Sequence, residues 1–140
     1  MTLGISLILV EVQYLAPVQY YSKFLKHSKV VIEQMEHYSK GSFRNRCVIA
    51  MAGGLQSLSI PLVKGKNQQT DIREVRIDYS QNWQQLHWRT VQTAYGSAPF
   101  FDYYKATIMQ FYEKKNGFVV RFLHRFSKSN FKIVKTESGY

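Results

Sequence analysis

Residues 47–63 read CVIAMAGGLQSLSIPLV, which are two apolar segments separated by a glycine pair. Gly53 and Gly54 are typical of the two-residue connection between antiparallel strands, because glycine readily adopts the positive φ angles of a tight hairpin turn. We therefore expect a β-hairpin with one arm over residues 47–51 and the other over residues 55–63.

Upstream of this hairpin the pattern predicts a strand, a helix and a second strand. Residues 3–12 are apolar and rich in β-branched side chains, which favours a buried strand. Apolar side chains recur at three- and four-residue spacing over residues 18–26, the pattern of a short amphipathic helix. Residues 30–32, all β-branched, are expected to form the second strand.

Downstream of the hairpin one strand and two helices are expected. Ile72, Val75 and Ile77 suggest the strand over residues 72–77. One helix should begin at Ser80, a good N-cap residue, and end at Tyr95, and another should cover residues 101–115. This order predicts an α/β protein with a single domain, a mixed sheet and a helical C-terminal part.

The composition excludes several classes of protein. The chain has 140 residues, a formal net charge of +10 and a single cysteine, Cys47. One cysteine cannot form an internal disulfide or a multi-cysteine zinc site, and it suits a reducing compartment. The apolar residues 3–12 are fewer than the roughly 20 that a membrane-spanning helix needs. We therefore expect a cytoplasmic protein with no membrane span.

The positive charge lies mostly at one end of the chain. Residues 105–140 carry +6 of the total and residues 1–104 carry +4. A basic, aromatic-rich chain could bind nucleic acid. However, the first 104 residues contain no nucleic-acid-binding signature, so a basic nucleic-acid-binding module is the less favoured alternative and no specific nucleic-acid partner is expected.

Six segments in order resemble a known family. They are QYLAPVQY (13–20), EHYSKGSFRNR (36–46), LSIPLV (58–63), DYSQNWQQLHWRTVQTAY (78–95), PFFDYY (99–104) and FYEKK (111–115). Together they resemble the WbqC-like family of bacterial proteins in its Bacteroides-type form. Members are often encoded near genes for O-antigen and other surface polysaccharides. The resemblance implies transfer of an acyl or aminoacyl group to a nucleotide-linked amino sugar.

The chain also departs from the family pattern. The usual Gln-Pro opening is replaced by Gln13-Tyr14, and similar members continue beyond the FYEKK motif. We therefore expect residues 1–115 to be a WbqC-like N-terminal region and residues 116–140 to be a divergent basic tail, where the family's C-terminal part is lost. A truncated, non-catalytic remnant is an alternative to a transferase.

A basic cluster is the first candidate site. It consists of Lys40, Arg44, Asn45 and Arg46, close to Gly41. Arginine can bind a phosphate or carboxylate through two parallel hydrogen bonds, and glycine lets backbone amides approach an anion. The expected partner is an anionic small molecule, either a nucleotide-sugar or an acyl donor. Alternatively, the arginines are solvated and pair with carboxylates such as Glu33, Glu36 or Asp78.

Four residues are candidates for proton transfer. Glu36 and His37 are adjacent, and a histidine can exchange protons near neutral pH while a carboxylate orients it or acts as a base. His87 should lie at the margin of the apolar helix face, and Asp78 precedes that helix. With the family resemblance, His87 and Asp78 become candidate catalytic residues. Tyr14 and Gln19 of the first motif become candidate substrate-binding residues.

The remaining patterns have simpler explanations. Five aromatic residues could stack on a sugar or a base, but core packing is favoured; they are Tyr95, Phe100, Phe101, Tyr103 and Tyr104. The four histidines lack metal-ligand spacing, and no P-loop or GxGxxG pattern is present. Neither a metal nor a cofactor is expected.

Overall fold

The computed structural model describes residues 4, 6–63 and 69–125. The described elements follow one another as β1 (Leu7–Val10), α1 (Val18–Lys26), β2 (Lys29–Ile32), β3 (Arg46–Met51), β4 (Gly54–Ser59), the 3-10 turn η1 (Ile72–Glu74), α2 (Trp83–Tyr95) and α3 (Phe101–Glu113). A further helical segment covers residues 119–125. The expected α/β class is confirmed.

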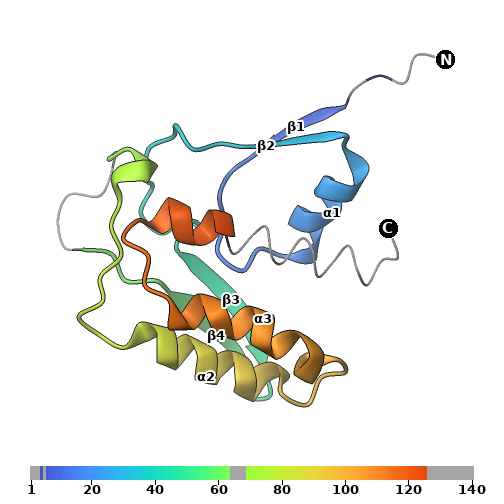
Figure 1. Ribbon diagram of the computed structural model, residues 1–140, viewed down its shortest axis with the longest axis vertical. Coiled ribbons are helices and arrows are strands. Elements are labelled where there is room, and N and C mark those ends of the chain that lie inside the picture. Colours follow the sequence, from blue (N-terminus) through green and yellow to red (C-terminus); the bar gives the residue numbers. More distant parts are fainter. Residues whose placement is uncertain (1–3, 5, 64–68, 126–140) are drawn as a thin grey trace.

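The strands form two separate two-stranded sheets. β1 and β2 are parallel, with Leu7 opposite Lys29, and α1 makes the crossover between them. β3 and β4 form the expected antiparallel hairpin, in which Met51 lies opposite Gly54 and the φ of Gly54 is 123°. Parallel and antiparallel pairing therefore both occur, but in different sheets, and Figure 1 shows the parallel pair and the hairpin in different parts of the molecule.

A small core holds α1 against the parallel sheet. The buried residues are Val10, Tyr20 and Tyr21, and the Tyr20 hydroxyl donates a hydrogen bond of 2.6 Å to the carbonyl oxygen of Glu11. Side chains alternate between the two faces of a strand, so Leu7 and Leu9 on β1 point away from this core and are exposed.

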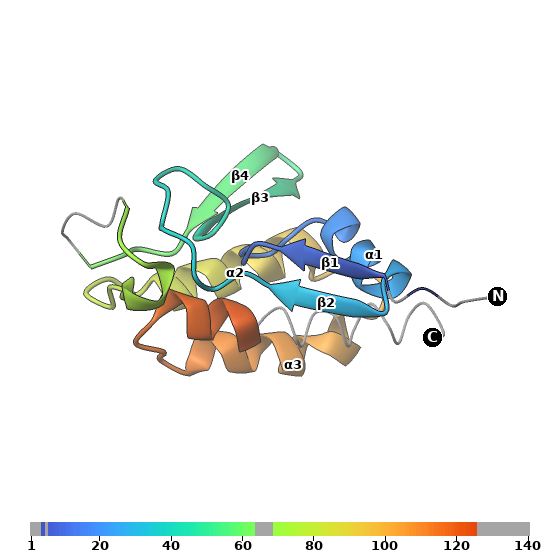
Figure 2. The same cartoon turned by 90° about the horizontal axis from the view of Figure 1, so that it is seen from above.

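The main core lies between the hairpin, α2, α3 and the segment 119–125. α2 contacts both β3 and α3, and Figure 2 shows it between the hairpin and α3. The buried Gln84 side chain donates a hydrogen bond of 2.8 Å to the Lys114 carbonyl just beyond α3. The helix C-terminus therefore has a partner for a carbonyl that no helical amide can reach.

The C-terminal part of the described chain contributes to this core. Val119, Phe122 and Leu123 are fully buried. They lie within residues 116–125, the described part of the expected basic tail, whereas residues 126–140 of that tail lie outside the described residues. The apolar spacing of these side chains explains their burial, since three- and four-residue intervals place them on one helix face.

Two local expectations are wrong. The strand expected over residues 72–77 does not form. Its first half is the 3-10 turn η1, because the Asp71 side chain accepts a hydrogen bond from the Arg73 amide and caps a turn, and Arg76 and Ile77 form only isolated β-bridges. α2 begins at Trp83 and not at Ser80, whose amide donates to Asp78 Oδ1 in a turn before the helix. In both cases a short polar side chain favours a turn over regular structure.

Candidate functional site

Arg44 is held by two carboxylates. Its Nε and Nη2 donate to Glu36 Oε1 and Oε2, each at 2.7 Å, and Nη2 lies 3.0 Å from Glu11 Oε2. The hydrogen bonds to Glu36 raise the pKa of Arg44 further above its ordinary value. The positive charge of Arg44 is therefore compensated, which is the ion-paired arrangement considered from the sequence.

Arg46 lies in a different environment. Its Nη2 donates a 2.6 Å hydrogen bond to the Gly41 carbonyl, and its guanidinium carbon lies 5.8 Å from the centre of the Phe43 ring. Its Nε is buried without a hydrogen-bond partner. Within the described residues no carboxylate forms an ion pair with Arg46. Arg46 is therefore a cation with an unused donor.

The other members of the basic cluster support the loop. Asn45 Oδ1 accepts a hydrogen bond of 3.2 Å from the Tyr38 hydroxyl, and its Nδ2 donates one of 3.0 Å to the Ile60 carbonyl. Asn45 thus fixes the loop to the end of β4. Lys40 is exposed. The φ of Gly41 is 77°, a conformation that glycine adopts easily.

Glu36 and His37 have separate surroundings. Both carboxylate oxygens of Glu36 accept hydrogen bonds from Arg44, whereas His37 is exposed and its backbone pairs with Asp71. Asp78 accepts from the amide of Ser80 in the turn before α2, and Gln19 is exposed on α1. The structure therefore brings Glu36 and Arg44 together but gives His37, Asp78 and Gln19 separate positions.

His87 lies inside the main core and not at its margin. It is 2% exposed, and its Nδ1 is 2.8 Å from the Tyr14 hydroxyl. Burial lowers the pKa of His87 to about 4, so the imidazole is neutral at pH 7. The sequence pattern placed His87 at the edge of the apolar helix face, because its contact with Tyr14, 73 residues away, could not be predicted from local spacing.

The hydrogen bonds around His87 have a defined direction. A backbone hydrogen bond to Ser59 requires the one N–H of the neutral ring, so Nδ1 accepts from the Tyr14 hydroxyl. The Tyr14 oxygen in turn accepts from the Tyr112 hydroxyl at 2.7 Å. Burial raises the pKa of both phenols, which therefore remain protonated. We call Tyr14, His87 and Tyr112 the buried network.

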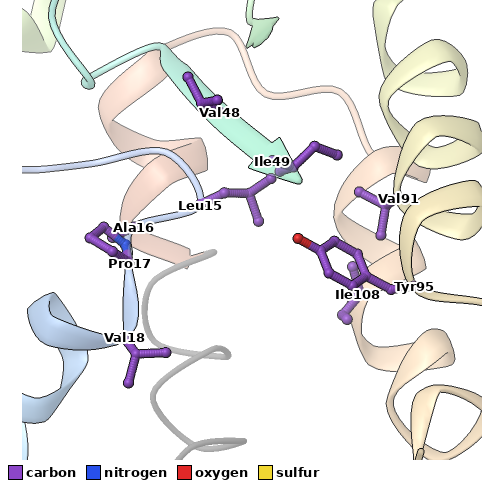
Figure 3. A pocket seen from close by; sticks show the side chains of 9 residues that line it. All are labelled: Leu15, Ala16, Pro17, Val18, Val48, Ile49, Val91, Tyr95 and Ile108. Carbon is purple, nitrogen blue, oxygen red and sulfur yellow. The ribbon is translucent and has the colours of Figure 1, made fainter. Parts of the chain in front are cut away.

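An apolar cleft lies beside the buried network. One part, of about 370 Å³, is lined by Gln13, Tyr14, Leu15, Ala16, Pro17, Phe43, Cys47 and Val48. The other, of about 350 Å³, is lined by Leu15, Ala16, Pro17, Val18, Val48, Ile49, Val91, Tyr95 and Ile108 (Figure 3). Because four residues line both parts, we treat them as one feature, the Leu15 cleft.

The Leu15 cleft and the basic loop are adjacent. Phe43 lines the cleft and also lies under Arg46, and the Tyr14 amide donates a hydrogen bond of 3.0 Å to the Phe43 carbonyl. Burial raises the pKa of Cys47, also in the lining, to about 12, so this side chain is a thiol. The cleft thus has apolar walls, and the lining residue Phe43 connects it to the guanidinium group of Arg46.

The sequence did not predict most of the cleft. Its apolar walls carry no charge or motif that distinguishes them from core residues. The expectation that the aromatic group packs in the core is wrong for Phe100 and Tyr103, which are 71% and 73% exposed, and for Tyr95, which lines the cleft. Phe101 does pack, with its ring centre 6.2 Å from that of Trp88.

Comparison with known protein families gives a match to the WbqC-like protein family over residues 12–138. The chain belongs to the WbqC-like protein family. This WbqC-like chain is also similar to the uncharacterized protein Rv1507c of Mycobacterium tuberculosis, at 37% identity over 73 residues. The similarity covers 51% of this chain and 30% of that protein. No solved structure matches it.

Neither a membrane-spanning helix nor a cluster of metal-binding side chains occurs in the part of this WbqC-like chain that the structure describes. Among residues 4, 6–63 and 69–125, no helix has the length and hydrophobicity to cross a bilayer. The same residues contain no cluster of three or more histidine, cysteine or acidic side chains that could bind a metal ion.

Proposed function

We propose that this WbqC-like protein acts in the biosynthesis of O-antigen or a related bacterial surface polysaccharide, where it transfers an acyl or aminoacyl group to a nucleotide-linked amino sugar. Family membership supports the setting. The observation that carries the proposal is Arg46, a cation without a carboxylate partner in the described structure, next to the Leu15 cleft.

In this proposal Arg46 binds the pyrophosphate of the nucleotide-sugar. A guanidinium group is always charged and can donate two parallel hydrogen bonds to a phosphate. The buried Nε of Arg46 would then have the acceptor that it lacks. Arg44 has a positioning role, because Glu36 and Glu11 already engage its Nε and Nη2 and compensate its charge.

The reaction joins the sugar amine to an activated acyl donor such as a thioester. The amine lone pair attacks the acyl carbon, a C–N bond forms, and the C–S bond to the carrier breaks. The amine loses one proton, which ends on the departing thiolate. Glu36 and His37 are the proposed acid–base residues on the loop that contains Arg46, and Asp78 remains a weaker candidate.

His87 has a different part in this proposal. Both of its ring nitrogens are engaged, one by Tyr14 and the other by Ser59. It is therefore a positioning residue, which holds Tyr14 and through it the wall of the Leu15 cleft. Lys40, Asn45 and Gln19 complete the candidate binding residues as surface contacts or loop supports.

Calorimetric titration with UDP-glucosamine tests the proposal. We expect saturable binding that Arg46→Gln weakens by at least about tenfold, because hydrogen bonds to a charged group contribute about 1.5–3 kcal/mol. Arg89→Gln removes the same charge from an exposed position on α2 and should bind like the unmodified chain.

Two outcomes would contradict the proposal. One is an equal loss of affinity in both variants, which would show only general attraction to positive charge. The other is absence of UDP-glucosamine binding together with strong binding to DNA that falls steeply with salt, which would favour the nucleic-acid alternative.

A further inference from the structure

We propose that the part of the Leu15 cleft that Tyr95 lines binds a saturated aliphatic acyl chain, whose carbonyl oxygen accepts a hydrogen bond from the Tyr95 hydroxyl. This inference rests on the proposed acyl transfer, and it specifies the chemical class of the donor.

The walls of this part of the cleft are aliphatic. Pro17 and Val18 lie on one side, Val91 and Ile108 lie on the other, and Leu15 lies between them (Figure 3). A nucleotide or a sugar would need several polar partners, which these side chains cannot supply. A volume of about 350 Å³ is within the usual range for small-molecule sites. These features favour a small apolar ligand.

Tyr95 supplies the polar side chain of this lining. Its hydroxyl points from α2 into the space between the helices and Leu15 (Figure 3). Within the described part of the chain this hydroxyl forms no hydrogen bond. One donor in an otherwise apolar cavity matches a ligand with a single carbonyl, which an acyl group provides.

The exposure of the lining side chains also indicates a ligand. Val18 is 72% exposed and Val48 is 49% exposed. An aliphatic chain bound between them would remove this apolar surface from water, and each methylene buried contributes about 0.8 kcal/mol to binding, or about fourfold in affinity.

The arrangement places two substrates in order along one cleft. Phe43 and Arg46 lie at the end where the nucleotide-sugar is proposed to bind, and Tyr95 lies in the part that would hold the acyl chain. Leu15, Ala16 and Pro17 line both parts. The acyl carbon and the sugar amine can therefore meet in the shared region.

Uncharged S-acyl-N-acetylcysteamine thioesters with 2, 4, 6 and 8 acyl carbons test the inference. We expect affinity to rise about fourfold for each added methylene until the cavity is filled. Val48→Trp should remove this dependence by filling the cavity, whereas Leu55→Trp on β4, outside the lining, should preserve it. Tyr95→Phe should weaken binding of every thioester by about fivefold.

Affinity that does not depend on chain length would overturn the inference. So would equal effects of the two tryptophan variants, or binding unchanged by Tyr95→Phe. Self-association of the unmodified chain that Val48→Trp abolishes would assign the cleft to a second copy and overturn the inference as well. If Val48→Trp does not fold, the chain-length series and Tyr95→Phe decide the result.

The two proposals can fail separately. Chain-length-dependent thioester binding without any UDP-glucosamine binding would retain the acyl site and reject the transfer to a nucleotide-sugar. UDP-glucosamine binding that depends on Arg46, with no thioester binding, would retain the proposed function and reject the acyl site.

Discussion

The buried network and the loop of residues 36–46 differ in how completely their polar side chains are hydrogen-bonded. In the core, Tyr14, His87 and Tyr112 satisfy one another, and each donor has a defined acceptor. On the loop, Arg44 has two carboxylate partners while Arg46 has a buried Nε with none. Saturation in one region and an unused donor in the other indicate where stability and where binding should respond to mutation.

The largest effect should come from His87→Ala. The change removes a buried ring together with its hydrogen bonds to the Tyr14 hydroxyl and to Ser59, so we expect a loss of about 3 kcal/mol in the free energy of unfolding. Urea denaturation measures it. His37→Ala alters an exposed histidine and should change stability by less than about 0.5 kcal/mol. Equal effects of the two variants would show that the network does not stabilise the fold.

Acid should weaken the network through the same histidine. In the unfolded chain His87 binds a proton below its ordinary pKa of 6.5, whereas in the folded chain it does so only near 4. The unfolded state therefore binds more protons between these values, and stability falls as the pH decreases from 6.5 to about 4. Lowering the pH from 7 to 5 should cost about 2 kcal/mol through this residue.

Denaturation at pH 7, 6 and 5 isolates this effect when the unmodified chain is compared with His87→Asn. The pH dependence of the variant should be shallower by the same amount. Parallel curves for the two proteins would mean that the histidine is not the group that titrates.

Removing single hydroxyls should show which tyrosine is central to the network. Tyr14→Phe interrupts the bonds to both His87 and Tyr112, so it should cost about 2 kcal/mol. Tyr112→Phe interrupts the bond to Tyr14 at the end of the network and should cost about 1 kcal/mol. Thermal or urea denaturation of the two variants gives the difference, and a larger loss for Tyr112→Phe would contradict the central position of Tyr14 in the network.

Arg44→Gln should lower the free energy of unfolding by less than His87→Ala or Tyr14→Phe does. The side chain is 13% exposed and forms its bonds near the surface, so we expect a loss of about 1 kcal/mol that decreases in 1 M salt. Arg73→Gln, which breaks a more exposed pair with Asp71, is the matched control and should cost less. A salt-independent loss would indicate packing and not charge as the source of stability.

The sequence predicted the local features well. The limits of α1 agree with the apolar spacing over residues 18–26, and the hairpin follows from its glycines. Both depend on side chains close together in the chain. The buried network joins Tyr14 to partners 73 and 98 residues away, and no local pattern indicates such a contact.

The candidate site could be predicted only in part. The basic loop was recognisable from its charges. Which arginine would form ion pairs depended partly on Glu11, and α1 and β2 separate Glu11 from the loop in the sequence. The strand expected over residues 72–77 does not form because apolar residues such as Ile72 and Val75 also suit a capped turn whose side chains enter the core. The Leu15 cleft requires packing between distant elements, which residue spacing does not define.

Leu15 itself has a φ of 42°, in the left-handed region that bulky residues rarely occupy. The backbone thereby turns sharply between Tyr14, which is committed to the interior, and Ala16 and Pro17, which face the cavity. Strained backbone of this kind usually persists only where the surrounding structure enforces it. The free-energy cost of this strained backbone is thus paid during folding. The cavity wall is therefore preorganised before a small molecule binds.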